Sequence, residues 1–271
     1  MCRVLDVSAS GFYAWRQRPA SQRSIENAQL LEKIRRVHLE SRKTYGSPRI
    51  HRVLRDSGIE CGRHRVSRLM RSARIVAQRM IRYRRISKTS HGRDVADNLV
   101  NRNFSVMSPN RVWASDMTYI WTGGGWLYLA VVLDLASRRV VGWAMDRRMT
   151  DQLTRNALAM ALQQRRPEAG LIHHSDQGSQ YASIGFQSML KEHGIKCSMN
   201  RLGDCYDNAV VESFFKTLKA ELVKEVRFKD REHGRLKLFE YIEVFYNRQR
   251  LHSTLDYKSP AQFEKQKFDL N

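Results

Sequence analysis

Cysteine is scarce in this sequence, and long apolar runs are missing. Only four cysteines occur among the 271 residues, and their spacing matches neither a CxxC pair nor the Cys and His spacing of a zinc module. No apolar run approaches the roughly 18 residues that a membrane-spanning helix needs, and no secretory signal is evident. We therefore expect free thiols in a reducing cytoplasm and no membrane partner. The four cysteines are Cys2, Cys61, Cys197 and Cys205.

Acidic residues are also few compared with basic ones. The chain holds 27 Asp and Glu against 48 Lys and Arg, a formal net charge of +21. The imbalance is concentrated in residues 1–112, which hold 25 of the basic residues and 8 of the acidic ones. So large an excess is costly to keep together without an anionic partner. Because no segment suits a membrane, the favoured partner is nucleic acid.

Residues 1–85 have the pattern of short helices broken by turns. The last of these helices places Val66, Leu69 and Met70 on one face. An arginine-rich helix after a short turn suits phosphate contacts or a major groove, so we interpret this part as a helix-turn-helix-like DNA-binding region. The alternative is a basic helical bundle without a specific ligand. Four arginines occupy the opposite face of the helix: Arg63, Arg65, Arg68 and Arg71.

Residues 86–110 are polar and basic and predict a linker, and beyond Pro109 the hydrophobic period changes from helical to alternating. Three strands in meander order then precede a helix, strand, helix, strand, helix series within residues 111–271. This mixed α/β order is that of a ribonuclease H-like sheet with flanking helices, here preceded by an all-α region. The predicted helices cover about residues 151–165, 183–193 and 208–219, and the strands between them residues 171–176 and 196–200.

Three acids in this second part occupy unusual positions. Asp116 lies mid-strand among apolar neighbours, where an unpaired carboxylate is costly, and Asp176 ends a strand. Glu212 lies beside the apolar stripe of its helix, on a second stripe with Lys216 and Lys219. If tertiary structure brings the three acids together, their oxygens suit Mg²⁺, and two such ions about 4 Å apart can support cleavage of a phosphodiester. For Glu212 the alternative is an ordinary i, i+4 ion pair with Lys216 on a surface helix.

Other acids in the same region compete for this role. Asp134 ranks first among them, and Asp146 also closes a strand. Asp204 and Asp207 precede the helix that carries Glu212, and helix capping is the simpler explanation for both.

Several further side chains have both a structural and a functional interpretation. His173 and His174 face opposite sides of a strand, so one of them can approach the acids, while at least one is expected in the core. Trp121, beside a glycine turn, suits stacking on a base. Near the carboxyl end, Arg250 and Tyr246 either contact DNA or pack the tail onto the core, and we favour packing for Tyr246. Three other tryptophans are expected in the core: Trp113, Trp126 and Trp143.

Four motifs together resemble a known family. SDMTYI contains Asp116, HSDQGSQY contains Asp176 and DNAVVESFFKTLK contains Glu212, with 35 residues between the second and third acids. Together with YNRQRLHSTLDYKSPAQF near the carboxyl end and the basic front part, they resemble the DDE transposases of insertion sequences, which are related to retroviral integrases. The best match is the second-reading-frame product of the insertion-sequence-three family.

The resemblance implies a ribonuclease H-like integrase core that cleaves DNA at the ends of an insertion sequence. The freed 3′-hydroxyl is then joined to target DNA by two-metal phosphoryl transfer. By matching motif, Asp116, Asp176 and Glu212 are implied as the catalytic metal ligands, with two Mg²⁺ ions that Mn²⁺ can replace. Lys219 is the downstream basic residue that the family pattern assigns to DNA, and Lys216 lies on the same stripe.

The resemblance also implies partners and a location. These are the double-stranded DNA of the element ends and of the target, further copies of the chain on that DNA, and an upstream-frame protein, in a bacterial cytoplasm near the nucleoid. The amino-terminal zinc module of the wider integrase group is missing, and no sustained heptad occurs. Two alternatives stay open: a structure-specific nuclease of the same fold that cleaves without joining, and a DNA-binding regulator whose acids are inactive.

Overall fold

The computed structural model describes residue 4 and residues 6–77, 96–201 and 205–268. The chain divides into two compact units, Met1–Gln78 and Arg79–Asn271, which we call the helical unit and the sheet unit. In the part of the chain that the structure describes, no helix has the length and apolar content needed to cross a bilayer. Cys2, Asp204 and residues 86–95 of the predicted linker lie outside the described residues.

The described residues of the helical unit form four helices, and α2, α3 and α4 contact one another. Their mutual core includes Ile34 from α2, Ile50 from α3 and Val66 from α4. Ser8 caps α1 by accepting a hydrogen bond from the backbone N–H of Gly11 at 3.0 Å. The expected core face of α4 is confirmed, since its three apolar residues are buried. The helices are α1 Ala9–Gln17, α2 Gln22–Glu40, α3 Ser47–Asp56 and α4 Arg63–Ser72.

The sheet unit is built on a five-stranded mixed sheet of order β3-β2-β1-β4-β5. The pairs β1–β2 and β2–β3 are antiparallel, whereas β1–β4 and β4–β5 are parallel. This arrangement confirms the predicted ribonuclease H-like sheet with flanking helices. The strands are β1 Val112–Thr122, β2 Gly125–Asp134, β3 Val140–Asp146, β4 Ile172–Ser175 and β5 Lys196–Met199.

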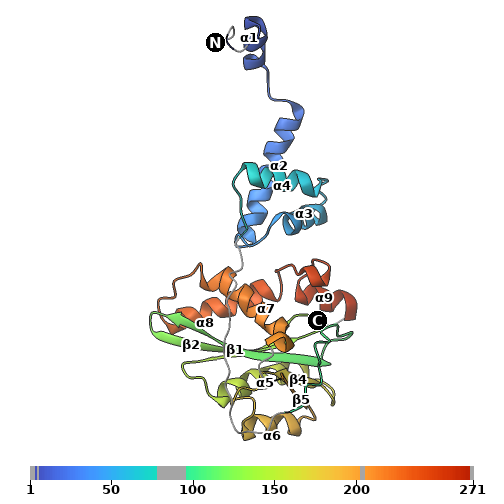
Figure 1. The fold of residues 1–271 in the computed structure, drawn as a ribbon, viewed down its shortest axis with the longest axis vertical. Helices are drawn as coiled ribbons and strands as arrows, with labels where there is room; N and C mark the ends of the chain where they lie inside the picture. The colour runs from blue at the N-terminus through green and yellow to red at the C-terminus, as the bar shows by residue number, and fades with distance from the viewer. Residues whose placement is uncertain (1–3, 5, 78–95, 202–204, 269–271) are drawn as a thin grey trace. The chain divides into compact units, whose positions relative to one another are not determined.

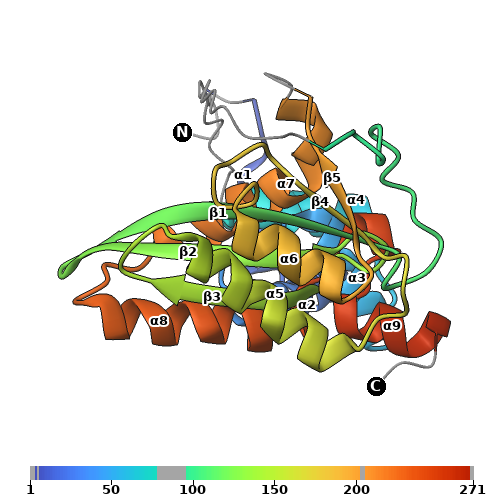
Figure 2. The ribbon, with the colours of Figure 1, turned by 90° about the horizontal axis from the view of Figure 1, so that it is seen from below.

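Helices cover both faces of this sheet, α5 and α6 on one side and α7 and α8 on the other (Figure 1). A second view shows α5 and α6 lying across the same face (Figure 2). The helices are α5 Asp151–Arg165, α6 Ile184–Glu192, α7 Ala209–Leu218, α8 Arg231–Phe239 and α9 Pro260–Phe268. Shorter helical turns are η1 Cys205–Asn208, η2 Lys219–Val223, η3 Glu240–Tyr246 and η4 Ser253–Leu255.

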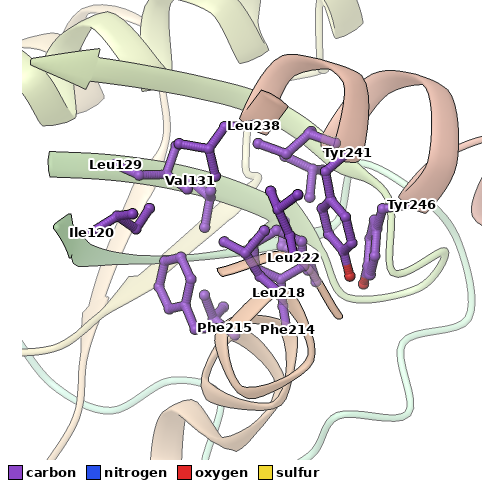
Figure 3. Close-up of a cluster of buried hydrophobic side chains, with 14 of the residues drawn as sticks. Ile120, Leu129, Val131, Phe214, Phe215, Leu218, Leu222, Leu238, Tyr241 and Tyr246 are labelled. Carbon is purple, nitrogen blue, oxygen red and sulfur yellow. The ribbon is translucent and has the colours of Figure 1, made fainter. Parts of the chain in front are cut away.

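Alternate residues of β1 enter different cores, as the pleat of a strand requires. Ala114 and Ile120 pack on the α7 side, and Trp113 and Met117 pack on the α5 side. The α7 side is shown in Figure 3, where Phe214, Phe215, Leu218 and Leu222 from α7 and η2 meet strand residues and the tyrosines of η3. Because Asp116 has the same parity as Ala114, β1 directs it toward the α7 side of the sheet.

The described part of the connecting segment, residues 96–110, lies against the sheet unit. Val100 is buried in the core on the α7 side. The backbone N–H of Leu99 donates to Ser198 Oγ at 2.9 Å, and the N–H of Met199 donates to the carbonyl of Asp97 at 3.3 Å. Through these contacts the connecting segment packs against β5 and forms part of the sheet unit.

Candidate active site

Asp116 lies in the middle of the sheet, between β2 and β4, and its side chain is buried. Its Oδ1 accepts a hydrogen bond from the backbone N–H of Met117 at 2.7 Å. A carboxylate so deep in a sheet loses most of its hydration, so it needs polar or charged neighbours.

Asp176 directly follows β4, the parallel neighbour of β1. The pairing aligns Val112 with Ile172 and Ala114 with His174, and the same register continued by two residues aligns Asp116 with Asp176. Aligned residues of neighbouring strands face the same side of a sheet. Asp176 Oδ1 also accepts a hydrogen bond from the N–H of Gly178 at 3.0 Å, which orders the turn after the strand.

The pKa of the Tyr181 phenol is affected by both aspartates. Burial raises the pKa of its phenol well above the ordinary value, and the negative charges of Asp116 and Asp176 raise it further. Its hydroxyl is buried and has no hydrogen-bond partner among the described residues. The Tyr181 hydroxyl therefore lies within electrostatic range of both aspartates.

Glu212 is carried by α7, whose start is tied to β1. Asn208 Nδ2 donates to the carbonyl oxygen of Ser115, the residue before Asp116, at 3.0 Å. Glu212 follows Asn208 by one helical turn and so extends from the same side of the helix. Its carboxylate forms an ion pair with Lys216 Nζ at 3.2 Å, and its side chain is 18% exposed. This is the i, i+4 pair that the sequence left open as the alternative.

The three acids match Mg²⁺ in kind, because hard cations prefer carboxylate oxygens. They are not gathered as ligands, however: among the described residues no group of three or more His, Cys, Asp or Glu side chains is arranged to hold a metal ion. The side chain of Glu212 is directed to Lys216, so its carboxylate would have to rotate to join the aspartates.

Comparison with known proteins follows the same division of the chain. Family models match an HTH-like domain at residues 24–85 and integrase core domains at residues 107–205 and 212–268. The chain is 44% identical to the insertion element IS600 uncharacterized 31 kDa protein of Shigella sonnei, over 97% of each chain. It is 45% identical to the transposase for insertion sequence element IS904 of Lactococcus lactis, over 92% of this chain and 98% of that one. Transposase InsF for insertion sequence IS3A of Escherichia coli is 42% identical, over 97% of this chain and 92% of that one.

The chain belongs to the IS3 family of insertion-sequence transposases. A chain in the cryoEM structure of the simian T-cell lymphotropic virus intasome in complex with PP2A regulatory subunit B56 gamma is similar to it in fold. The TM-score is 0.50 at 19% identity, and the match covers 65% of this chain and 60% of that chain.

The competing acids of this IS3-family chain have structural partners. Asp134 is fully buried and accepts hydrogen bonds from the backbone N–H groups of Asn110 at 2.6 Å and Ala136 at 2.9 Å. Asp146 accepts from the N–H groups of Arg147 and Arg148 in the turn after β3. Both acids therefore stabilise turns at strand ends.

The capping prediction for Asp207 is wrong. Its buried carboxylate accepts hydrogen bonds from Asn98 Nδ2 at 2.8 Å and Arg102 Nε at 3.1 Å, and it pairs with Arg201. These partners satisfy the carboxylate in place of the free N–H groups of α7. Asn98 and Arg102 lie more than 100 residues away in sequence, so local patterns could not reveal this role; the only sequence signal was an acid before a helix.

Both histidines of β4 are core residues. His173 Nε2 lies 2.7 Å from Ser115 Oγ, and burial lowers its pKa to about 3. His174 Nδ1 lies 2.8 Å from Ser198 Oγ, and its Nε2 lies 3.0 Å from the carbonyl oxygen of Asp207. Burial also lowers the pKa of His174. The His173 imidazole therefore joins β4 to β1, and the His174 imidazole joins β4 to β5 and to η1.

The arginines expected to contact DNA differ in their surroundings. Arg63, Arg68 and Arg71 are exposed on α4. Arg65 is partly buried, with Nε donating to Asn27 at 2.9 Å and Nη2 to Glu26 at 3.1 Å.

Arg250 belongs to a buried network in the carboxyl-terminal tail. Its Nη2 and Nε donate to the two carboxylate oxygens of Glu221 at 2.7 and 2.8 Å, and Tyr241 Oη donates to the same carboxylate at 2.8 Å. A DNA contact by Arg250 would require this network to open. Tyr246 is buried beside it, which confirms the packing role expected for this residue.

An exposed aromatic cluster marks the β1–β2 hairpin. The ring of Trp126 lies edge-on to those of Tyr119 and Trp121, with centroid distances of 5.1 and 4.8 Å. The prediction of a core position for Trp126 is wrong, because its side of the hairpin extends past the covering helices and leaves it 42% exposed. Lys219 Nζ lies 5.4 Å from the centre of the Tyr119 ring. Trp113 is fully buried as expected, and Trp143 is partly buried against the core.

Proposed function

We propose that this chain is a DNA transposase that cleaves insertion-sequence ends and joins the freed 3′-hydroxyl to target DNA. Asp116, Asp176 and Glu212 would hold two Mg²⁺ ions, which Mn²⁺ can replace. The observation that carries the proposal is the register of β1 and β4, which pairs Ala114 with His174 and, extended by two residues, would align the two aspartates. The hydrogen bond between Asn208 and Ser115 supports the third position, because it ties the helix of Glu212 to the strand of Asp116.

The bound ions would supply charge stabilisation of the scissile phosphate and activation of the attacking oxygen. The chain's own residues would position the DNA. Lys216 and Lys219 lie beyond Glu212 on the same helix and its extension, where their ammonium groups can contact phosphates. The exposed arginines of α4 would bind the double-stranded element end.

Assembly on DNA belongs to the same proposal. Cleavage at two element ends and joining to one target require two active sites to act together, which favours a homo-oligomer formed on the DNA. An upstream-frame protein is a further expected partner, and the reaction would take place in the bacterial cytoplasm, near the nucleoid.

The test mixes the protein and Mg²⁺ with labelled inverted repeats taken from the DNA that flanks the reading frame. We expect a cleaved 3′ end and a joined product, and neither with Asp116→Asn. Asp146→Asn serves as a matched control, because it makes the same change in a turn-stabilising acid. Cleavage without a joined product would favour the nuclease, and DNA binding without cleavage would favour the regulator. Unchanged strand joining by Asp116→Asn would reject the metal assignment.

A further inference from the structure

Asp207 connects three segments of the sheet unit through one buried carboxylate. It accepts hydrogen bonds from Asn98 and Arg102 of the connecting segment and from the backbone N–H and the guanidinium of Arg201 after β5. Burial alone would raise the pKa of the Asp207 carboxyl, but the bonds from Arg201 and Arg102 outweigh it and lower the pKa to about 2. The carboxylate is therefore charged and fully engaged at neutral pH.

The backbone of Asp207 and the next residue, Asn208, contact or adjoin the elements that carry the three candidate catalytic acids. The Asp207 carbonyl contacts His174, two residues before Asp176. Asn208, next in the chain, binds the carbonyl of Ser115, one residue before Asp116. Asn208 also directly precedes the first residue of α7, so that Glu212 follows about one turn later.

We propose that Asp207 is a positioning residue for this site. Its carboxylate fixes residues 98–102 and Arg201 around the start of α7, and this holds Glu212 in place relative to the two aspartates. The inference rests on the proposed function, since it concerns the same three acids. Asp207 touches neither DNA nor a metal ion in this role and acts only through α7.

The hydrogen bonds at the start of α7 add directional constraints to its apolar packing. Apolar contacts are non-directional, so they constrain the orientation of the helix start less than hydrogen bonds do. Hydrogen bonds to a charged, buried acceptor are directional, so they favour one position of the helix start. Groups that orient ligands in this way change metal affinity or activity by about 10- to 100-fold when removed.

The experiment compares Asp207→Ala and Asp207→Asn in the full chain. Arg235→Ala is the control, because it removes a partly buried guanidinium of the sheet unit that donates to the carbonyl of Met145. Hydrogen exchange is measured first, without DNA or metal. Asp207→Ala should raise exchange in the first turn of α7 and at the N–H of Arg201, while exchange in α5 stays at the wild-type level. Wild-type exchange at the start of α7 would overturn the inference whether or not the protein cleaves DNA.

Cleavage kinetics then separate positioning from general loss of structure. Asp207→Ala should lower kcat by about 10- to 100-fold and raise the Mg²⁺ concentration for half-maximal cleavage, with little change in KM for the DNA end. Asp207→Asn, which keeps one acceptor oxygen, should recover part of kcat. An unchanged Mg²⁺ dependence in Asp207→Ala would contradict the inference. If exchange responds as expected but the wild-type protein does not cleave, the proposed function fails and the positioning of α7 stands.

Discussion

The arginines of the helical unit and those of the sheet unit differ in what surrounds them. In the helical unit, Arg63, Arg68 and Arg71 are exposed along one helix. In the sheet unit, the side chains of Arg165 and Arg250 are 9% and 7% exposed and pair with buried glutamates. The same residue type is therefore exposed to solvent in one unit and stabilises the fold in the other. The net charge of a segment indicates its partner only where its basic residues are not already paired with acidic residues of the same fold.

The largest contrast between the units should appear when a candidate catalytic acid is neutralised. Asp176→Asn should reduce cleavage by roughly 10³-fold or more, because it removes a proposed metal ligand at the reacting phosphate. DNA binding, which we assign to the helical unit, should persist. Single-turnover cleavage and fluorescence anisotropy on the same DNA end measure the two effects. A comparable loss of cleavage and of DNA binding would mean that the two activities do not belong to separate units.

Breaking a buried ion pair should produce the next largest effect. Arg250→Ala leaves Glu221 buried without its cation and should lower the free energy of unfolding by about 3–5 kcal/mol. Arg68→Ala, on the exposed face of α4, should change it by no more than about 0.5 kcal/mol. Urea unfolding measures both. The double substitution Arg250→Met with Glu221→Leu should restore much of the loss, and equal effects of the two alanine substitutions would refute the contrast.

Removing the exposed arginines of α4 should weaken DNA binding and make its affinity less dependent on salt concentration. Each lost phosphate contact makes the slope of log affinity against log salt less negative by about 0.9, so alanine at Arg63, Arg68 and Arg71 should reduce its magnitude by roughly 2 to 3. Alanine at Arg35 and Arg36 of α2, which pair with glutamates, is the control. A slope that the α4 substitutions leave unchanged would place the DNA elsewhere.

Acidification should destabilise the sheet unit through His173. The folded state holds this imidazole neutral down to a pKa of about 3, whereas the unfolded state takes up a proton near pH 6.5. The free energy of unfolding should therefore fall as the pH drops from 6.5 toward 3, by up to about 1.4 kcal/mol per pH unit for this group. In His173→Asn the slope of unfolding free energy against pH should be smaller. An identical slope in the variant would show that His173 is not the group responsible.

The smallest effect is expected at the aromatic cluster of the hairpin. Stacking of an unpaired base on Trp121 is worth about 1 kcal/mol at the low end of measured values, so Trp121→Ala should weaken binding of a DNA end with unpaired bases about fivefold. Binding of a blunt duplex should not change. Phe239→Ala, at another exposed aromatic ring, is the control. Equal losses for both DNA forms would argue against base stacking.

Hydrophobic periodicity predicted most of the sheet unit, because a buried face of a helix or strand requires apolar residues at the period of that element. Residues 151–165 were expected as a helix, and α5 spans those residues. The apolar stripe of Val211, Phe214 and Leu218 is buried as its spacing required. Trp126 was misplaced because strand alternation does not reveal where the covering helices end.

Long-range polar partners could not be predicted in this way. The bonds from Asn98 and Arg102 to Asp207, and from Arg250 to Glu221, join residues 29 to 109 positions apart. No periodic pattern encodes such pairs, because each depends on the finished fold. For the same reason, the sequence could name Asp116, Asp176 and Glu212 but not the residues that orient them.

The most direct test of the proposed metal site is to locate Mn²⁺ by its anomalous scattering in crystals of the protein bound to a cleaved element end. We predict ions within about 2.2 Å of carboxylate oxygens from Asp116, Asp176 and Glu212, with Glu212 released from Lys216. Ions bound at other side chains, with Glu212 still paired to Lys216, would contradict the proposal.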